Sequence, residues 1–566
     1  MHAPLSIKQS YAGRHVLLTG VTGFLGKVWL AMMLDYVPEI GKIYVLTRKK
    51  ALRPAADRFE KAVASSPCFR PLHERLGPEM SRFVSDRVEV VEGDVSLPRL
   101  GIEDPAVYDR LRRDLDLVVN CAGLVDFDPD LRDAMTTNVD GARFTAEFVA
   151  ACDRATLLHV STCYVTGLKN GRIEETLVPE RSPSGDAFDV DAECAEIAAS
   201  IEALLAEHES PEADRRATEE ALKQIREKGQ DEHNAMLVRN VARRVKRSNL
   251  KDAMVSEGQR RATRWGFTNI YTFTKSMAEA TIARRLAPDR WSMFRPAIVE
   301  SSMSYPFPGW NQGFNTCGPL TYALGGWFRH LPCRFGNPFD IIPVDYVCRA
   351  MAVAGAALMR REHSPVYQCG SSDLNLLTVD RATELVALAH RKWLRTRGDT
   401  AVERVLLSRW DAIAVKPDHA LKIENVRSVT ESIRDWLRDP PKGWPKFVRT
   451  RLMDMVDNAE EALDGIDKIE RMCELYLPFI HDNSYTFITR NLLRHPVVEP
   501  EFNCDPRTID WRHYWIDVHV PGLRKWCFPL IENKTPENYT PRHPFRLRPA
   551  APSAGAAQPA QHAEVV

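Results

Sequence analysis

Short apolar runs separated by longer amphipathic stretches shape the first half of the chain. Each run is rich in leucine or in β-branched side chains, and the stretches between the runs have helical spacing. Strands that alternate with helices are typical of a parallel sheet covered by helices. The sequence therefore predicts a doubly wound α/β fold. Its strands are expected in a run that begins at Val16 and in the runs Ile43–Thr47, Val88–Val91, Leu115–Asn120, Thr156–Ser161 and Trp291–Val299.

A long polar interval, from about Gly171 to Trp265, interrupts this alternation. Glu, Ala, Arg and Lys dominate it, while Ile197, Ile201 and Leu204 recur at helical spacing. The interval predicts an inserted pair or trio of helices.

The pattern changes again downstream of this insert. Residues 301–345 are rich in Pro, Gly and aromatic residues, which suits an irregular segment at a pocket mouth, and a second helical region runs from about Thr378 to Trp526. We predict an N-terminal arm of residues 1–11 and an α/β domain of residues 12–375, with the insert at about 171–265. A helical domain of residues 376–548 and a tail of residues 549–566 follow. The tail is too poor in large apolar residues to fold.

Charge and cysteine content narrow the class of protein. Lys plus Arg and Asp plus Glu number 76 each, so the overall charge gives no reason to expect a nucleic-acid partner. The twelve cysteines include no C-x-x-C pair, and no charged-then-apolar leader precedes the first strand, which favours a cytoplasmic protein with reduced thiols. The apolar run Ala350–Met359 is about half of the ~20 residues that a helix needs to cross a bilayer, so we expect no transmembrane segment.

The first strand leads into a glycine-rich turn, VLLTGVTGFLG, that ends at the start of a helical pattern. Gly20 permits the tight turn, Gly23 lets backbone N–H groups approach a phosphate, and Gly26 lets the helix pack closely on the strand. The turn predicts a dinucleotide site, in which Thr22, Phe24 and Leu25 also contact the cofactor.

The end of the second strand predicts which dinucleotide binds. An acidic residue usually meets the ribose 2′-hydroxyl of NADH there, but the sequence reads Thr47-Arg48-Lys49-Lys50 and has no acid between Gly41 and Arg53. These cations would attract the 2′-phosphate of NADPH, so NADPH is the expected cofactor. Further contacts to it are expected after the third and fourth strands, from Asp94, Val95, Ala122 and Gly123.

Tyr271 and Lys275, in YTFTK, are four residues apart, so on a helix both side chains lie on one face. An ammonium beside a phenol favours the phenolate, which predicts a Tyr271 pKa below its usual value of about 10 and a role in proton transfer to a carbonyl. Ser161 and Thr162 end the fifth strand, at the sheet edge where ligands bind, and supply a hydroxyl for that carbonyl. Asn138, in TNVDGA, is expected to begin a helix between them.

These segments resemble the extended short-chain dehydrogenase/reductase superfamily, since TGVTGFLG, GDVS, NCAG, TNVDGA, STCY and YTFTK occur in its order. The resemblance implies a Rossmann sheet with Tyr271 and Lys275 catalytic, and a hydroxyl of Thr162 or Ser161 at the carbonyl. It also implies that Asn138 supports a water-mediated proton relay. RPAIVESS looks like the segment against the nicotinamide, which adds Pro296 and Ile298 to the cofactor contacts.

More narrowly, the chain is similar to fatty acyl-CoA reductases in STCYV, YPFPGW and IIPVDYV, and the region Tyr476–Trp526 resembles their C-terminal male-sterility helical domain. The resemblance implies NADPH-dependent reduction of a long-chain acyl-CoA to the aldehyde and onward to the primary alcohol, as in wax ester biosynthesis. The sequence departs from many relatives at Cys163 and in the length of the insert.

Other functions stay open at this point. A carrier-linked thioester reductase that stops at the aldehyde is the nearest rival, although no adenylation or carrier segment precedes residue 12. A sugar-nucleotide epimerase or dehydratase would rarely need the second helical domain, and the intact Tyr271 and Lys275 argue against a non-catalytic scaffold.

Smaller signals carry weaker hypotheses. The basic run Arg239–Lys251 suits coenzyme A phosphates or an anionic membrane surface, with a solvated helix face as the alternative. Cys121 and Cys163 invite a covalent thioester mechanism, which the Tyr/Lys pair makes unnecessary. His481, His513 and His519 lack a compact ligand spacing, so no metal site is expected.

Overall fold

The computed structural model describes residues 4–49, 53–313, 317–326, 328–397, 411–416, 427, 431, 476–536 and 539–547. The predicted tail, residues 549–566, lies outside the described residues, as does much of the predicted helical domain between residues 398 and 475.

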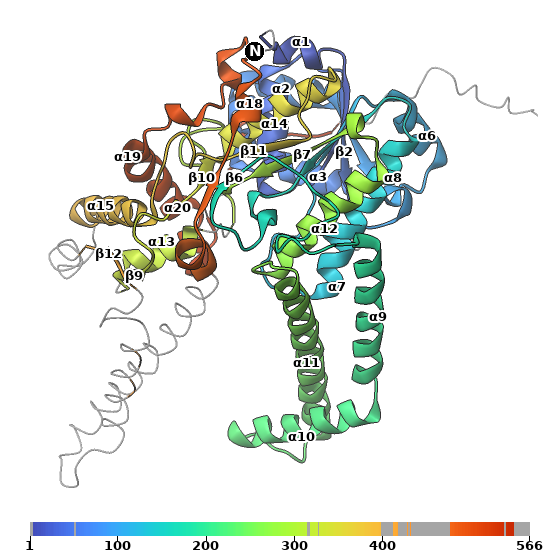
Figure 1. Cartoon of the computed structure of the whole chain (residues 1–566), viewed down its shortest axis with the longest axis vertical. Helices are drawn as coiled ribbons and strands as arrows, with labels where there is room; N and C mark the ends of the chain where they lie inside the picture. Colours follow the sequence, from blue (N-terminus) through green and yellow to red (C-terminus); the bar gives the residue numbers. More distant parts are fainter. Residues whose placement is uncertain are drawn as a thin grey trace, which may run out of the picture.

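A seven-stranded parallel sheet lies at the centre of the molecule, in the strand order β11-β7-β5-β4-β1-β2-β3 (Figure 1). The strand order reverses beside β1, which pairs with both β2 and β4. The strands are β1 (His15–Thr19), β2 (Lys42–Thr47), β3 (Val88–Glu92), β4 (Leu117–Asn120), β5 (Thr156–Val160), β7 (Trp291–Pro296) and β11 (Val366–Cys369). Ligands of open parallel sheets bind at the carboxyl ends of the strands near such a reversal.

Helices cover both faces of this sheet. They are α1 (Ile7–Tyr11), α2 (Phe24–Tyr36), α3 (Ala55–Ser65), α4 (Arg70–Leu76), α5 (Met80–Arg87), α6 (Pro105–Asp114), α7 (Leu131–Ala134), α8 (Gly141–Ala151), α12 (Ile270–Arg285) and α14 (Val344–Met359). Alternate residues of β1 enter different cores: Val16 and Leu18 join that of α2 and α14, whereas Leu17 joins that of α8 and α12. The doubly wound fold is confirmed.

The apolar run Ala350–Met359 forms the second half of α14 and is almost wholly buried against the sheet. Within the described residues, no helix combines the length and the apolar character that crossing a bilayer requires.

The last predicted strand, Trp291–Val299, is wrong as a single element. β7 ends at Pro296, where it pairs with Cys369 of β11, and the chain then leaves the main sheet. The next residues form β8 (Ile298–Glu300), which pairs with β10 (Ile341–Pro343) in a separate two-stranded sheet. Pro296 has no N–H with which to continue the ladder, and the Ile298 N–H donates to the Asp340 carbonyl (3.1 Å).

Two further pairs of strands join β9 (His330–Pro332) to β12 (Ile413–Val415) and β6 (Gly171–Ile173) to β13 (Tyr485–Phe487).

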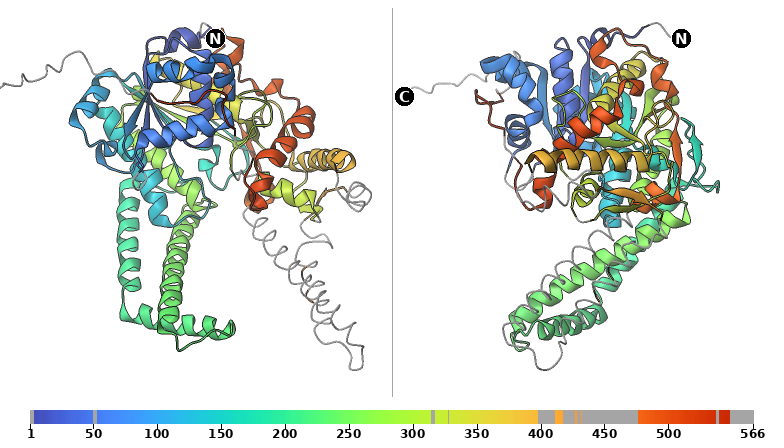
Figure 2. Two further views of the ribbon diagram at one scale, coloured as in Figure 1. Left: turned by 180° about the vertical axis from the view of Figure 1, so that it is seen from behind. Right: turned by 90° about the vertical axis from the view of Figure 1, so that its left-hand side faces the viewer.

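The insert contains three helices, α9 (Val190–His208), α10 (Pro211–Glu227) and α11 (Ala235–Arg264), which project away from the sheet (Figures 1 and 2). Its first residues are not helical, because β6 and an extended stretch precede α9. Asp189 then caps α9 by accepting hydrogen bonds from the N–H groups of Asp191 and Ala192.

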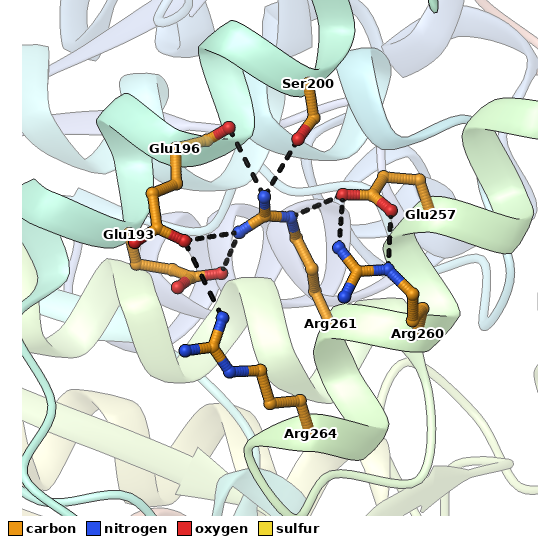
Figure 3. A network of polar contacts seen from close by, with 7 residues as sticks. All are labelled: Glu193, Glu196, Ser200, Glu257, Arg260, Arg261 and Arg264. Atoms are coloured by element: carbon orange, nitrogen blue, oxygen red, sulfur yellow. Dashed lines mark hydrogen bonds and ion pairs between the residues drawn. The ribbon is translucent and has the colours of Figure 1, made fainter.

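A buried arginine ties the base of the insert together (Figure 3). The Arg261 side chain on α11 is 5% exposed, and it donates to the carboxylates of Glu193 and Glu257 (2.7 Å each) and to the Ser200 hydroxyl (2.8 Å). Removing one partner of a buried ion pair leaves a charge uncompensated. The network therefore holds α9 against α11 where both meet the α/β domain.

The C-terminal region returns to the α/β domain. Two helices, α13 (Cys317–Gly325) and α15 (Val379–Arg397), come before residue 476. The described helices after it are α18 (Arg490–Leu493), α19 (Trp511–His513), α20 (Val520–Trp526) and α21 (Phe528–Ile531). In residues 476–536 frequent prolines keep the helices short, since proline cannot continue a helix interior. The N-terminal arm lies against this region: the Val498 N–H donates to the Leu5 carbonyl (3.1 Å), and Glu499 accepts from the Ile7 N–H (2.9 Å).

Candidate active site

Tyr271 and Lys275 lie in the first turns of α12, beside the carboxyl end of β5. The Asn269 side chain begins the helix by accepting from the Thr272 N–H (2.9 Å). The Lys275 ammonium donates to the carbonyl of Val160, the last residue of β5 (2.6 Å), and the Tyr271 phenol is hydrogen-bonded to the Thr162 hydroxyl. Helix and strand end therefore place the phenol, the ammonium and the Thr162 hydroxyl together, as the sequence predicts.

The predicted direction of the Tyr271 pKa is wrong. Burial raises the pKa of Tyr271 to about 12, and the hydrogen bond from Thr162 only partly offsets this effect. The Lys275 ammonium does not reverse it, because that group is held at the Val160 carbonyl. Burial also lowers the pKa of Lys275 to about 8. At neutral pH Tyr271 thus keeps its proton and is suited to donate it.

The two other predicted catalytic residues have different surroundings. The Ser161 hydroxyl is buried and has no hydrogen-bond partner among the described residues. Asn138 does not begin a helix: it lies in a π-helical turn that continues α7 into α8. Its amide binds the Leu124 N–H (2.8 Å), the Leu124 carbonyl (3.1 Å) and the Thr274 hydroxyl (3.1 Å). Asn138 thereby fastens the loop after β4 to α12, and its role in a proton relay stays a prediction.

A cavity of about 490 Å³ opens at this point. Predicted residues from both sites line it: Gly20, Gly23, Phe24, Leu25, Gly26, Gly123, Ser161, Thr162, Tyr271, Lys275, Pro296 and Ile298. The fold therefore brings the glycine turn and the predicted catalytic residues to a single space.

A second cavity, of about 230 Å³, shares Gly20, Gly23, Cys121 and Gly123 with the first. Its other walls include the predicted residues Thr22, Arg48, Asp94, Val95 and Ala122. The two cavities together form a path from the end of β2, past the glycine turn, to Tyr271. This is the course that an extended dinucleotide would take.

The glycine turn has the geometry that a pyrophosphate requires. Gly20 has a φ of +73°, and a Cβ there would lie 2.7 Å from the backbone carbonyl of Cys121. No side chain caps the first turn of α2, so its N–H groups and the positive end of its dipole are available to an anion. These residues fit a bound dinucleotide.

The cations after β2 do not behave alike. A nitrogen of Arg48 lies 3.7 Å from the Asp94 carboxylate, at the wall of the second cavity. Lys49 instead faces Glu92 (3.5 Å) and Glu103 (3.6 Å) and does not line that cavity. Sequence reasoning missed Arg58, which reaches the cavity from α3 and donates to the Arg48 carbonyl. A cation near the start of the helix after β2 was the only signal for it.

The sequence did not single out the particular aromatic side chains that line the first cavity. Phe127 follows β4, Tyr164 follows β5, and Tyr476 and Phe479 come from the C-terminal region. No local pattern marks them, because they meet only in the folded chain.

The two cysteines near the site are unsuited to nucleophilic attack. Burial raises the pKa of Cys121 to about 11 and that of Cys163 well above its ordinary value. Both are therefore thiols at neutral pH, and the thiolate is the nucleophilic form.

Comparison with known proteins identifies the family. Residues 18–351, more than half of the chain, match the NAD-binding family described as male sterility protein. The chain belongs to the male sterility protein family. The resemblance to fatty acyl-CoA reductases drawn from the motifs is thereby confirmed at the level of the family.

Relatives of this family member match it over most of their length. An alcohol-forming fatty acyl-CoA reductase of Simmondsia chinensis is 27% identical over 92% of this chain and 98% of its own. Fatty acyl-CoA reductase 8 of Arabidopsis thaliana is 28% identical over 90% of this chain and 96% of its own. Among solved structures, the reductase domain of a non-ribosomal peptide synthetase from Mycobacterium tuberculosis is 16% identical with a TM-score of 0.48, covering 92% of this chain and 95% of that one.

Proposed function

We propose that this protein is an NADPH-dependent fatty acyl-CoA reductase that converts a long-chain acyl-CoA thioester to the aldehyde and then to the primary alcohol. The observation that carries the proposal is that Tyr271, Thr162 and Lys275 open into the same cavity as the glycine turn. The near full-length similarity to proteins named fatty acyl-CoA reductases supports the choice of substrate.

Each side chain has its own role at the substrate carbonyl. Tyr271 and Thr162 donate hydrogen bonds to the oxygen as negative charge develops on it, and the unpartnered Ser161 hydroxyl supplies another donor within the same cavity. A bound reduced nicotinamide supplies hydride to the carbon. In the first reduction, collapse of the tetrahedral adduct restores the carbonyl and expels the coenzyme A thiolate, which takes a proton from water. In the second, Tyr271 gives its proton to the alkoxide.

Arg48 and Arg58 support NADPH as the cofactor. Both line the second cavity at the end of β2, where the ribose 2′-position of a dinucleotide lies in this fold. Guanidinium groups form charge-assisted, often bidentate hydrogen bonds to phosphate. We assign the 2′-phosphate to these two arginines, with Lys49 outside direct contact.

The stoichiometry of the reaction tests the proposal. The protein is incubated without oxygen with NADPH and hexadecanoyl-CoA, and the NADPH oxidised is divided by the coenzyme A released. A ratio near two indicates the alcohol as product, and a ratio near one indicates the aldehyde. An absence of coenzyme A release would overturn the proposal.

A further inference from the structure

The two ends of the main cavity differ in chemical character. At the glycine turn the wall is backbone and small side chains around the start of α2, which suits phosphate. The aromatic group Phe127, Tyr164, Tyr476 and Phe479 lines the same cavity together with the apolar side chains of Leu320, Phe339 and Ile480. Asp126, next to Phe127, is the charged residue of this part of the wall.

The aromatic rings form a continuous wall that starts at the catalytic phenol. The Phe127 ring centroid lies 6.3 Å from that of Tyr271, and Phe127 stacks on Phe479 at 5.7 Å. The Tyr164 ring meets Phe479 edge-on at 5.0 Å. Such offset and edge-to-face contacts are the favoured arrangements of aromatic pairs, so the wall is held in place by packing and not by a ligand.

Exposure sets the direction in which a substrate enters. Val125, in the loop after β4, lines the cavity and is 73% exposed, whereas Ile480, which also lines it, is 2% exposed. A thioester has one polar end, the coenzyme A, and one apolar end, the acyl chain. The chain therefore points inward to the aromatic wall, and the coenzyme A leaves past Val125 toward solvent.

We propose that Phe127, Tyr164 and Phe479 form an acyl slot that holds the carbons next to the thioester carbonyl, and that Phe479 selects straight chains over chains branched there. This inference rests on the proposed function. The cavity of about 490 Å³ must also hold the nicotinamide ring, so the slot accommodates only the first carbons of a long chain. Because Phe127 and Phe479 pack directly on each other, the slot runs along their shared wall and not between the rings. A straight methylene chain lies flat against such a wall, whereas a methyl branch holds the chain away from it.

Packing in the hydrophobic core does not by itself explain why Phe127, Tyr164 and Phe479 line the cavity. Tyr485 and Phe487 stack on the far side of Tyr164 at 5.5 Å from each other, and neither lines the cavity. They are the core part of this aromatic cluster. Phe127 and Tyr164 are partly exposed, and the buried Phe479 lines the cavity with them, whereas the core pair is buried and does not line it.

The test uses one widening and one narrowing substitution, Phe479→Ala and Phe479→Trp, with Tyr485→Phe as the matched control. The control removes only a hydroxyl that donates to the Gly167 carbonyl (3.1 Å). The readout is the ratio of kcat/KM for 3-methylhexadecanoyl-CoA to that for hexadecanoyl-CoA.

We expect Phe479→Ala to raise this ratio at least tenfold, Phe479→Trp to lower it, and Tyr485→Phe to leave it unchanged. Damage to the fold would move both substrates together and could not give shifts of opposite sign. An unchanged ratio in both Phe479 variants, or an equal shift in the control, would overturn the slot.

Binding separates this outcome from a failure of the proposed function. Decan-1-ol is titrated into the full-length protein by calorimetry, which needs no turnover. Its affinity should fall at least fivefold in Phe479→Ala, Phe479→Trp and Phe127→Ala, and stay at the wild-type value in Tyr485→Phe. If the wild type releases no coenzyme A but shows this pattern, the slot stands and the assigned reaction fails. Equal affinities in all five proteins would overturn the slot.

Discussion

The two ends of the candidate active-site cavity are built in opposite ways. The nucleotide end comes from one short segment, since Gly20 and Gly23 lie in the turn between β1 and α2 and Gly26 lies in the first turn of α2. The aromatic end comes from residues that are far apart in the sequence, with Phe127 more than three hundred positions from Phe479. Local geometry constrains the first end, whereas only packing constrains the second. The comparison suggests that cofactor binding tolerates little change and that chain selectivity is easily altered.

The largest effect on turnover is expected from replacing Tyr271, which lies where the two ends of the cavity meet. Replacing Tyr271 with Phe removes the proton donor but keeps the ring that packs on Phe127, so turnover should fall by about 10²–10⁴-fold while NADPH affinity stays within about twofold. Steady-state rates with hexadecanoyl-CoA and a fluorescence titration with NADPH measure both. Unchanged turnover would remove Tyr271 from the mechanism.

Substitution of Gly20 tests the rigidity of the nucleotide end. An alanine there would have a φ of +73° and a Cβ 2.7 Å from the Cys121 carbonyl, so we expect the Kd for NADPH to rise at least tenfold. Gly13→Ala is the matched control, because Gly13 also has a positive φ, +67°, but has nothing within 4 Å of the added Cβ. Equal effects in the two variants would show that backbone strain, and not the close approach, limits binding.

Arg48 and Arg58, which we assign to the 2′-phosphate of NADPH, allow a more specific test of the nucleotide end. Removing Arg48 and Arg58 together should lower kcat/KM for NADPH by roughly 10–100-fold, since a hydrogen bond to a charged group is worth about 1.5–3 kcal/mol, and should leave NADH almost unaffected. Lys49→Ala is the control, because Lys49 pairs with Glu92 and Glu103 and does not line the second cavity. A loss in the control equal to that in the double variant would refute the assignment.

The lowered pKa of Lys275 predicts a loss of activity on the alkaline limb of the pH profile. Burial lowers this pKa to about 8, so the ammonium is present below pH 8 and is lost as the pH rises through that value. We expect kcat/KM for NADPH, which reports groups of the free enzyme, to fall about tenfold per pH unit above 8. The residual rate of Lys275→Met should lack this limb. A limb retained in that variant would assign the titration to another group.

The smallest effect concerns the support of the aromatic end. The Glu300 carboxylate accepts from the N–H of Cys317 (3.0 Å), which begins the α13 wall of the cavity, and it lies 3.8 Å from the buried His519. Burial raises the pKa of Glu300 to about 7. The folded protein thus binds a proton that the unfolded chain has lost above pH 4.5, and stability falls as the pH rises from about 4.5 to 7.

A shift of this size corresponds to about 3 kcal/mol. The Tm of the wild type should therefore fall between pH 5 and pH 8 by a few degrees more than that of Glu300→Gln, whose amide oxygen can still accept from Cys317. Parallel Tm curves for the two proteins would show that Glu300 does not titrate in this range.

Sequence reasoning placed most of the candidate site residues near one another because their motifs end strands of one parallel sheet. The carboxyl ends of β1, β4 and β5 must meet at one edge, so Gly20, Gly123 and Thr162 could be placed together in advance. The same reasoning gave the wrong sign for the Tyr271 pKa. Residue spacing shows that an ammonium and a phenol share a helix face, but it does not show that Lys275 is held by the Val160 carbonyl or that burial dominates.

The sequence by itself determined the α/β fold, the glycine turn and the candidate catalytic residues, because each depends on a few neighbouring positions with strict local geometry. Only the tertiary structure decided the break of the last predicted strand at Pro296, the place of Arg58 beside Arg48, and the aromatic wall of Phe127, Tyr164 and Phe479. These features arise from contacts between residues that are distant in the chain. Such contacts leave no periodic or spaced signal in the sequence, because many residue types fill an apolar space and packing alone selects their partners.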